Sequence, residues 1–156
     1  DTDSMHIKLK DIPKLKEAYK KKYGRELVGG DMGQFHNDFD PIKRMVNGKE
    51  KKYKVIGACK TLGLGKKSSY DKTVAWDDDN NKLIFGEHYR MKGIPPAIIK
   101  KRAKELGTDV EGLYEILWSG EAIEFDLAKY PDIPSFGYLD DGTVYSRSKF
   151  IRVVQF

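Results

Sequence analysis

The side chains of this sequence that are best suited to metal chemistry are two histidines and the carboxylates near them. In the segment HNDFDP, His36, Asp38 and Asp40 alternate along the chain. Imidazole nitrogens and carboxylate oxygens at such short separations can hold a divalent metal ion that activates water for hydrolysis. His88 follows Glu87 in the segment FGEHYR and is a further candidate ligand. The sequence therefore allows one hypothesis of metal-dependent hydrolysis.

Ordinary structural roles also account for these acids. Asp40 precedes PIKRMVNGK, which we expect to form a short helix that Asp40 caps and Gly48 ends. Asp38 suits a turn, because its short side chain can bond the backbone two residues on. No serine lies in a motif typical of a nucleophile. We therefore expect a binding protein rather than an enzyme, with no cofactor, and keep a metal-dependent nuclease as an alternative.

The segment CKTLGLGKKSS, residues 59–69, has the glycines and lysines of a phosphate-binding loop. A nucleotide-binding P-loop requires Gly, four residues, and then Gly-Lys-Ser/Thr. Lys60 stands where the first glycine is required, and Lys67 stands where serine or threonine is required. The segment is therefore expected to be a flexible basic loop, either a solvated hairpin tip or a contact for the phosphates of a nucleic acid.

Charge is distributed unevenly along the chain, although the net charge is only +5. Residues 8–25 hold eight basic residues against two acids, and residues 43–72 hold ten against two. Residues 108–142 hold one lysine against nine acids. Such asymmetry indicates a basic surface for a polyanion. Mutual neutralisation of the two regions within the fold is the alternative.

The basic regions supply candidate contacts for DNA or RNA phosphates. Aromatic residues stand beside basic ones in KKYK, SSYDK and HYRMK, a pattern that suits base stacking but also ordinary strand surfaces. The candidate nucleic-acid-binding residues are Lys20, Lys21, Lys51, Lys52, Lys60, Lys66, Lys67, Lys100, Lys101, Arg102 and Lys104.

Length and composition favour one globular domain. The 156 residues suffice for a hydrophobic core, and we expect a single domain over residues 5–156. DTDS before Met5 is expected to be a cloning remnant. The single cysteine, Cys59, fits a reducing cytoplasm, and no apolar run approaches the length of a membrane span. The oligomeric state is not determined by these patterns.

Glycine, proline and short polar residues mark the ends of the expected helices and strands, and the order of these elements predicts an α+β fold. DIPKLKEAYKKKYGREL is expected to be an N-terminal basic helix that Asp11 caps and Gly24 ends. KKYKVIGACKTL, TVAW and KLIFG are expected to be strands of a small antiparallel sheet, with DDDNN as a hairpin turn. A central helical hairpin follows at residues 95–120, and EAIEFDL, PSFGYL, TVYSR and KFIRVVQF form a β-rich C-terminal segment.

The helical hairpin has the residue pattern of a helix-turn-helix. Relative to the turn glycine Gly107, Ala103 is the small residue of the first helix, and Leu113 and Ile116 are apolar residues of the second. The stretch RAKELGTDVEGLYEILWSGEAIEF, about a sixth of the chain, resembles helix-turn-helix units of phage and mobile-element proteins, including those attached to homing endonucleases. The resemblance, over residues 95–124, implies a phage-type DNA-binding protein in the host cytoplasm.

Acids on the second helix leave other functions open. Asp109, Glu111 and Glu115 would repel phosphates if this helix entered a groove. An ordinary helical hairpin with Leu113, Ile116, Leu117 and Trp118 in its core is therefore an alternative. The acidic region 108–142 can also be the working surface of a protein-interaction module, such as a phage factor that disables a host protein. The leading hypothesis is a small phage-type nucleic-acid-binding protein that contacts phosphates through a basic surface.

Overall fold

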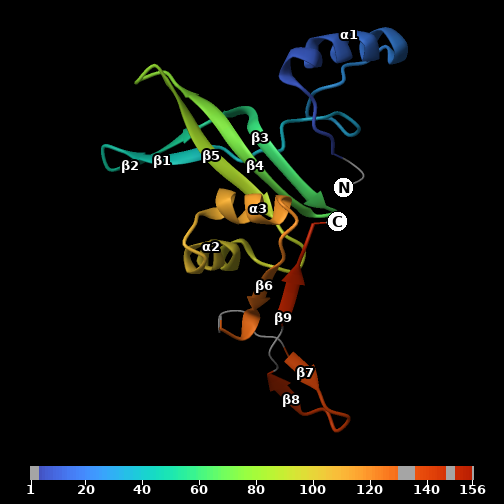
Figure 1. The fold of residues 1–156 in the computed structure, drawn as a ribbon. Coiled ribbons are helices and arrows are strands. Elements are labelled where there is room, and N and C mark those ends of the chain that lie inside the picture. Colours follow the sequence, from blue (N-terminus) through green and yellow to red (C-terminus); the bar gives the residue numbers. More distant parts are fainter. Residues whose placement is uncertain (1–3, 130–135, 147–149, 156) are drawn as a thin grey trace. The chain divides into compact units, whose positions relative to one another are not determined.

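The computed structural model describes residues 4–129, 136–146 and 150–155 and has the predicted α+β fold (Figure 1). The chain forms two compact units. The first unit comprises residues 1–59 and 72–88, and the second unit comprises residues 60–71 and 89–156.

The first unit contains η1 (Leu9–Asp11), α1 (Ile12–Tyr23), β1 (Ile42–Val46) and β2 (Lys49–Tyr53). Three longer strands, β3 (Val55–Gly65), β4 (Ser68–Asp77) and β5 (Lys82–Arg90), form one sheet in the order β3-β4-β5 and contribute residues to both units. The second unit contains α2 (Pro96–Glu105), α3 (Val110–Trp118), β6 (Ile123–Asp126), η2 (Leu127–Lys129), β7 (Phe136–Tyr138), β8 (Val144–Ser146) and β9 (Phe150–Val153). Strand β6 pairs with β9, and β7 pairs with β8, both antiparallel.

Helix α1 has the predicted extent but not the predicted cap. Pro13 lies in its first turn, and Gly24 ends it with a φ of 68°, a left-handed conformation that glycine adopts without strain. The Asp11 side chain makes no capping hydrogen bond. None of the residues of α1, all of which the structure describes, is buried. Its apolar residues, Leu15 among them, therefore lie at the surface.

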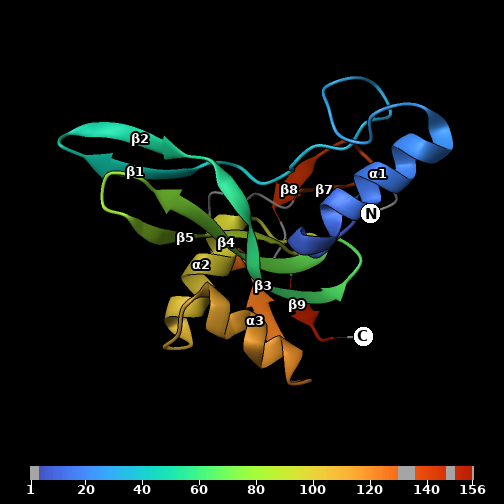
Figure 2. The same cartoon turned by 90° about the horizontal axis from the view of Figure 1, so that it is seen from above.

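The helix predicted after Asp40 is wrong, because this segment is a β-hairpin. Strands β1 and β2 run antiparallel, as the two-stranded ribbon in Figure 2 shows. Asn47 and Gly48 connect them, with φ angles of 50° and 74°. Two consecutive left-handed residues define the turn that best matches the twist of paired strands, and Asn-Gly favours it strongly. Asp40 consequently caps no helix.

The hairpin contributes to the core of the first unit. Ile42 and Tyr53 are opposite each other in the β1–β2 register and are buried with Val55 and Ala75. Partly buried Ile84 packs against this cluster. Burial of this apolar pair favours the strand conformation of the segment. The sequence pattern alone did not show that the two residues would be buried together.

The turn predicted in DDDNN is confirmed between β4 and β5. Asp77 is buried, and its carboxylate accepts hydrogen bonds from the backbone N–H of Asp79 and from the Asn80 side chain at 2.7 Å. The bond from Asn80 is the largest cause that lowers the pKa of Asp77. Asp77 is therefore an acceptor that fixes the turn.

Helices α2 and α3 have the predicted extents and form the core of the second unit. Gly107 has a φ of 72° between them, and the Asp109 carboxylate accepts from the backbone N–H of Gly112 at 2.7 Å, so Asp109 is the cap. Buried Leu113 and Leu117 confirm part of the alternative core, whereas Trp118 is 50% exposed. The buried residues on the two helices are Ile98, Ile99, Ala103, Val110, Leu113, Tyr114 and Leu117, and they pack with Leu62, Leu64, Tyr70 and Phe125.

Candidate nucleic-acid interface

The basic residues singled out in the sequence are divided between the two units. In the first unit, Lys20 and Lys21 lie on α1, and Lys51 and Lys52 lie on β2. The second unit holds the rest on β3, the β3–β4 turn and α2: Lys60, Lys66, Lys67, Lys100, Lys101, Arg102 and Lys104. Each unit therefore carries its own set of candidate phosphate contacts.

Lys60 is held by carboxylates of its own unit. Its Nζ lies 2.9 Å from Glu111 Oε1 and also donates a hydrogen bond to Glu115. The bond to Glu115, followed by the bond to Glu111, raises the pKa of Lys60 above its ordinary value. Two carboxylates more than neutralise one ammonium, so Lys60 has little charge to offer a phosphate.

The same contacts involve the acidic residues of α3. Glu111 and Glu115 bind Lys60, while Asp109 caps the helix. Helix α3 also buries Leu113 and Leu117 in the second unit. Reversing the charges of Glu111 and Glu115 would therefore disturb the fold as well as any protein-binding surface.

The flexible loop expected at residues 59–69 is mostly strand. Strand β3 continues to Gly65, and β4 begins at Ser68, so only Lys66 and Lys67 form the turn. Lys67 has a φ of 59°. The segment is therefore the tip of a hairpin, and its role as a phosphate contact stays a prediction. Neither lysine has an ion-pair partner among the described residues.

The candidate metal ligands do not form a metal-sized cluster. His36 Nε2 lies 3.8 Å from Asp38 Oδ1, with both side chains mostly exposed. Asp40 is exposed ahead of β1. The His88 ring meets Phe39 edge-on at a centroid distance of 5.7 Å. Within the part of the chain that the structure describes, no three His, Cys, Asp or Glu side chains could hold a metal ion.

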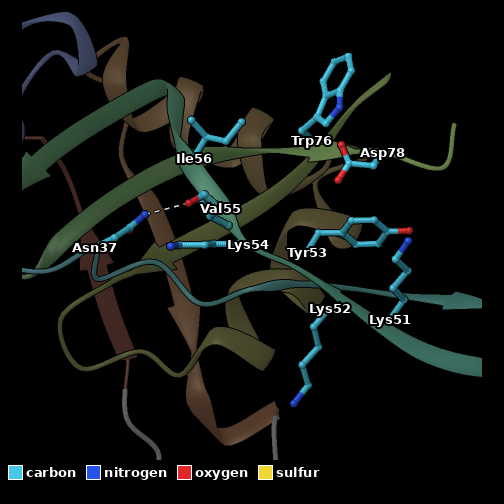
Figure 3. A pocket seen from close by; sticks show the side chains of 9 residues that line it. All are labelled: Asn37, Lys51, Lys52, Tyr53, Lys54, Val55, Ile56, Trp76 and Asp78. Carbon is cyan, nitrogen blue, oxygen red and sulfur yellow. Dashed lines mark hydrogen bonds between the residues drawn. The ribbon is translucent and has the colours of Figure 1, made fainter. Parts of the chain in front are cut away.

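A hollow of about 560 Å³ opens in the first unit where β2 meets β3 (Figure 3). The chain bends at Lys54, the single residue between these strands. Asn37 Nδ2 donates to the Val55 carbonyl oxygen at 2.9 Å and ties the preceding loop to the bend. The hollow is lined by Asn37, Lys51, Lys52, Tyr53, Lys54, Val55, Ile56, Trp76 and Asp78.

Two of the three lysines in the hollow have no acidic partner in the described residues. Lys51 pairs with Asp79, which raises the pKa of Lys51, and its Nζ lies 4.9 Å from the centroid of the Tyr53 ring. Lys52 and Lys54 are exposed and pair with no described carboxylate. Asp78 is the one acid in the lining. The hollow therefore has an excess of positive charge.

The β1–β2 hairpin brings further like charges together. Its register places Lys43 opposite Lys52 and Arg44 opposite Lys51. Like charges directly opposite each other destabilise a strand pair. Lys43 Nζ lies 3.8 Å from Glu50 Oε1, which offsets part of the repulsion. Between residues 42 and 54 there are six basic residues and one acid. We call this segment the basic hairpin.

Sequence reasoning identified Lys51 and Lys52 but missed Lys54 and Trp76. The signal for Lys54 was present, since KKYK interleaves lysines with an aromatic residue. Trp76 lies in TVAW, which predicted a strand but not which face the ring would occupy. Only folding brings β4 beside the bend at Lys54.

Comparisons with known proteins do not assign this chain to a family. No protein-family model, no curated protein and no solved structure matched it. The helix-turn-helix resemblance of residues 95–124, the phage origin and the cytoplasmic location therefore stay predictions. No described helix has the length and apolar character needed to span a membrane.

Proposed function

We propose that this protein binds nucleic acid and that the basic hairpin, with the hollow at its base, is the contact surface. The observation that carries the proposal is the pair of exposed lysines, Lys52 and Lys54, that line the hollow without a described carboxylate partner. Phosphate groups at regular spacing are the ligand that such a surface fits best.

The register of the basic hairpin supports the same proposal. Folding places Lys43 opposite Lys52 and Arg44 opposite Lys51, an arrangement of like charges that costs free energy in the unbound protein. The ion pairs of Lys43 with Glu50 and of Lys51 with Asp79 offset part of this cost. A polyanion that lies along the hairpin would relieve this repulsion. Bound cations of the nucleic acid would be released as lysines replace them, so the affinity must fall steeply with salt.

Fluorescence anisotropy with a labelled 15-nucleotide strand, measured across a salt series, tests the proposal. The double variant Lys52→Ala/Lys54→Ala removes two phosphate contacts. At about 0.7 counterions per contact on a single strand, the log–log salt slope should fall by about 1.4, and the affinity at about 0.1 M salt by roughly 25-fold.

The matched control is Lys100→Ala/Lys104→Ala, which removes the same charge from exposed positions on α2. It should change the slope much less if the basic hairpin is the contact surface. If both double variants lose the same affinity and salt slope, binding depends on the net charge of the protein and not on the basic hairpin. Absence of binding at low salt would exclude nucleic-acid binding altogether.

A further inference from the structure

In the first unit, the sheet of β3, β4 and β5 has one packed face. Successive side chains of a strand point to opposite faces. Val55 on β3, Ala75 on β4 and Ile84 on β5 all pack into the cluster that contains Ile42 and Tyr53. Gly86 belongs to this face too, since a Cβ there would lie 2.8 Å from an Ile42 side-chain atom.

The opposite face of these strand segments carries large apolar side chains that water reaches. Ile56 follows Val55, Trp76 follows Ala75, and Figure 3 shows both on the same side of the sheet. Trp76 is 42% exposed and Phe85 is 46% exposed. Leu83 and Ile56 are exposed to a similar degree. We call Ile56, Trp76, Leu83 and Phe85 the apolar face.

Apolar side chains on the solvated face of a sheet indicate that a binding partner covers them. An antiparallel sheet with one solvated face normally alternates apolar residues inward with polar residues outward. Here the strands are apolar on the solvated side as well. Exposed apolar side chains gathered on one face of a sheet, with polar residues around them, are typical of an interaction site.

Cations border the apolar face. Lys72 Nζ lies 5.5 Å from the centroid of the Phe85 ring, within the range of a cation–π contact. Trp76 and Ile56 also line the hollow that holds Lys52 and Lys54. Trp76 therefore lines the same hollow as Lys52 and Lys54, and Phe85 lies beside the cation of Lys72. A ligand that fits must present flat apolar rings and negative charges at short separation.

We infer that the ligand of this site is single-stranded nucleic acid, whose bases stack on Trp76 and Phe85 while its phosphates meet Lys52 and Lys54. This inference rests on the proposed function and names its substrate class. A duplex hides the faces of its bases and offers only phosphates and groove edges. A single strand exposes both, and aromatic side chains beside cations bind it with little sequence preference.

Stacking and phosphate contacts use groups that DNA and RNA share. The 2′-hydroxyl, which distinguishes the two, has no designated partner in this arrangement. The site is therefore expected to bind single strands of either sugar. An apolar protein partner would use the face differently, because it would need Trp76 and Phe85 but not Lys52 and Lys54.

The test compares fluorescently labelled 15-nucleotide strands of dT and rU with a duplex of 15 base pairs and with inorganic polyphosphate. Both single strands should bind more tightly than the duplex at equal salt. Trp76→Ala should weaken their binding by about 5- to 150-fold, the range found when one base-stacking aromatic residue is removed. Trp76→Phe should restore most of the affinity.

Trp118→Ala is the matched control, because it removes the same residue type at similar exposure from the second unit. It should leave the affinity unchanged. A direct readout uses the Trp118→Phe background, in which Trp76 is the only tryptophan. Its emission should be quenched by the dT and rU strands but not by polyphosphate, which has no bases to stack.

The outcomes separate this inference from the proposed function. If the duplex binds as tightly as the single strands and Trp76→Ala is neutral, while Lys52→Ala/Lys54→Ala still weakens binding, the protein binds nucleic acid but the single-strand inference is wrong. If polyphosphate matches the single strands, or if the Trp76 emission does not change, stacking is likewise excluded. If no nucleic acid binds, both proposals fail, and the apolar face is left for a protein partner.

Discussion

Replacing Lys52 by glutamate should stabilise the protein while it weakens nucleic-acid binding. In the β1–β2 register Lys52 lies opposite Lys43, so Lys52→Glu converts a repulsive pair into an attractive one. A favourable cross-strand charge pair contributes roughly 0.2 to 1 kcal/mol. For a chain of this length, the corresponding rise in Tm is about 0.5 to 4 °C.

The effect on binding has the opposite sign. Lys52 lines the hollow without a described carboxylate partner. Loss of one phosphate contact should lower the log–log salt slope by about 0.7 and the affinity at about 0.1 M salt by roughly fivefold. Repulsion between the new carboxylate and the phosphates adds to this loss. A stability gain that accompanies a functional loss is typical of a residue retained for binding.

Thermal unfolding and fluorescence anisotropy measure the two effects on the same samples. The matched control is Lys49→Glu, which makes the same charge change opposite the uncharged Val46. Lys49→Glu should not raise the Tm in this way, because it leaves the repulsion between Lys43 and Lys52 in place. A Tm that falls in Lys52→Glu, or rises equally in both variants, would contradict the register argument. An unchanged affinity in Lys52→Glu would contradict the placement of the binding site.

Three further predictions concern stability. Leu117→Ala should cost about 2 to 5 kcal/mol in urea unfolding because it empties a fully buried site, whereas Trp118→Ala should cost far less because Trp118 is half exposed. Gly86→Ala should destabilise by about 1 to 3 kcal/mol because its Cβ would lie 2.8 Å from neighbouring side-chain atoms, whereas Gly63→Ala meets nothing within 4 Å and should be tolerated. The glutamate partners of Lys60 raise its pKa, so the stabilisation that the ion pairs give is present below the ordinary lysine pKa and is lost in alkali. The difference in unfolding free energy between the wild type and Lys60→Met, measured in urea at several pH values, should therefore shrink as the pH rises through the raised pKa. A difference that stays constant with pH would refute the ion pairs.

Elements with strong local signals were predictable. Gly24 ends α1 and Gly107 lies in the turn between α2 and α3, each at the expected position. Pro95 and Pro96 open α2, and Asp109 caps α3. These residues act through their own backbone conformation or through bonds to neighbours a few positions away. No distant partner is needed, so the sequence alone suffices.

The segment around Asn47 shows where local signals conflict. The residues after Asp40 have a plausible cap and a glycine stop, which predicted a helix, yet Asn-Gly is also the strongest short hairpin signal. Burial of Ile42 against Tyr53 accompanies the strand conformation. That contact joins residues eleven positions apart, and a local pattern cannot weigh it.

Composition and order along the chain determined the α+β class, the basic character and the set of candidate lysines. Only the tertiary structure decided which of those lysines have charge left to offer. Lys60 stands in the most phosphate-like segment of the sequence, yet it is held by glutamates 51 and 55 positions away. Lys54 was not among the candidate residues chosen from the sequence, yet it lines a hollow together with Trp76. Neutralisation and exposure depend on which distant residues a fold brings within a few ångströms, and one-dimensional spacing does not encode those distances.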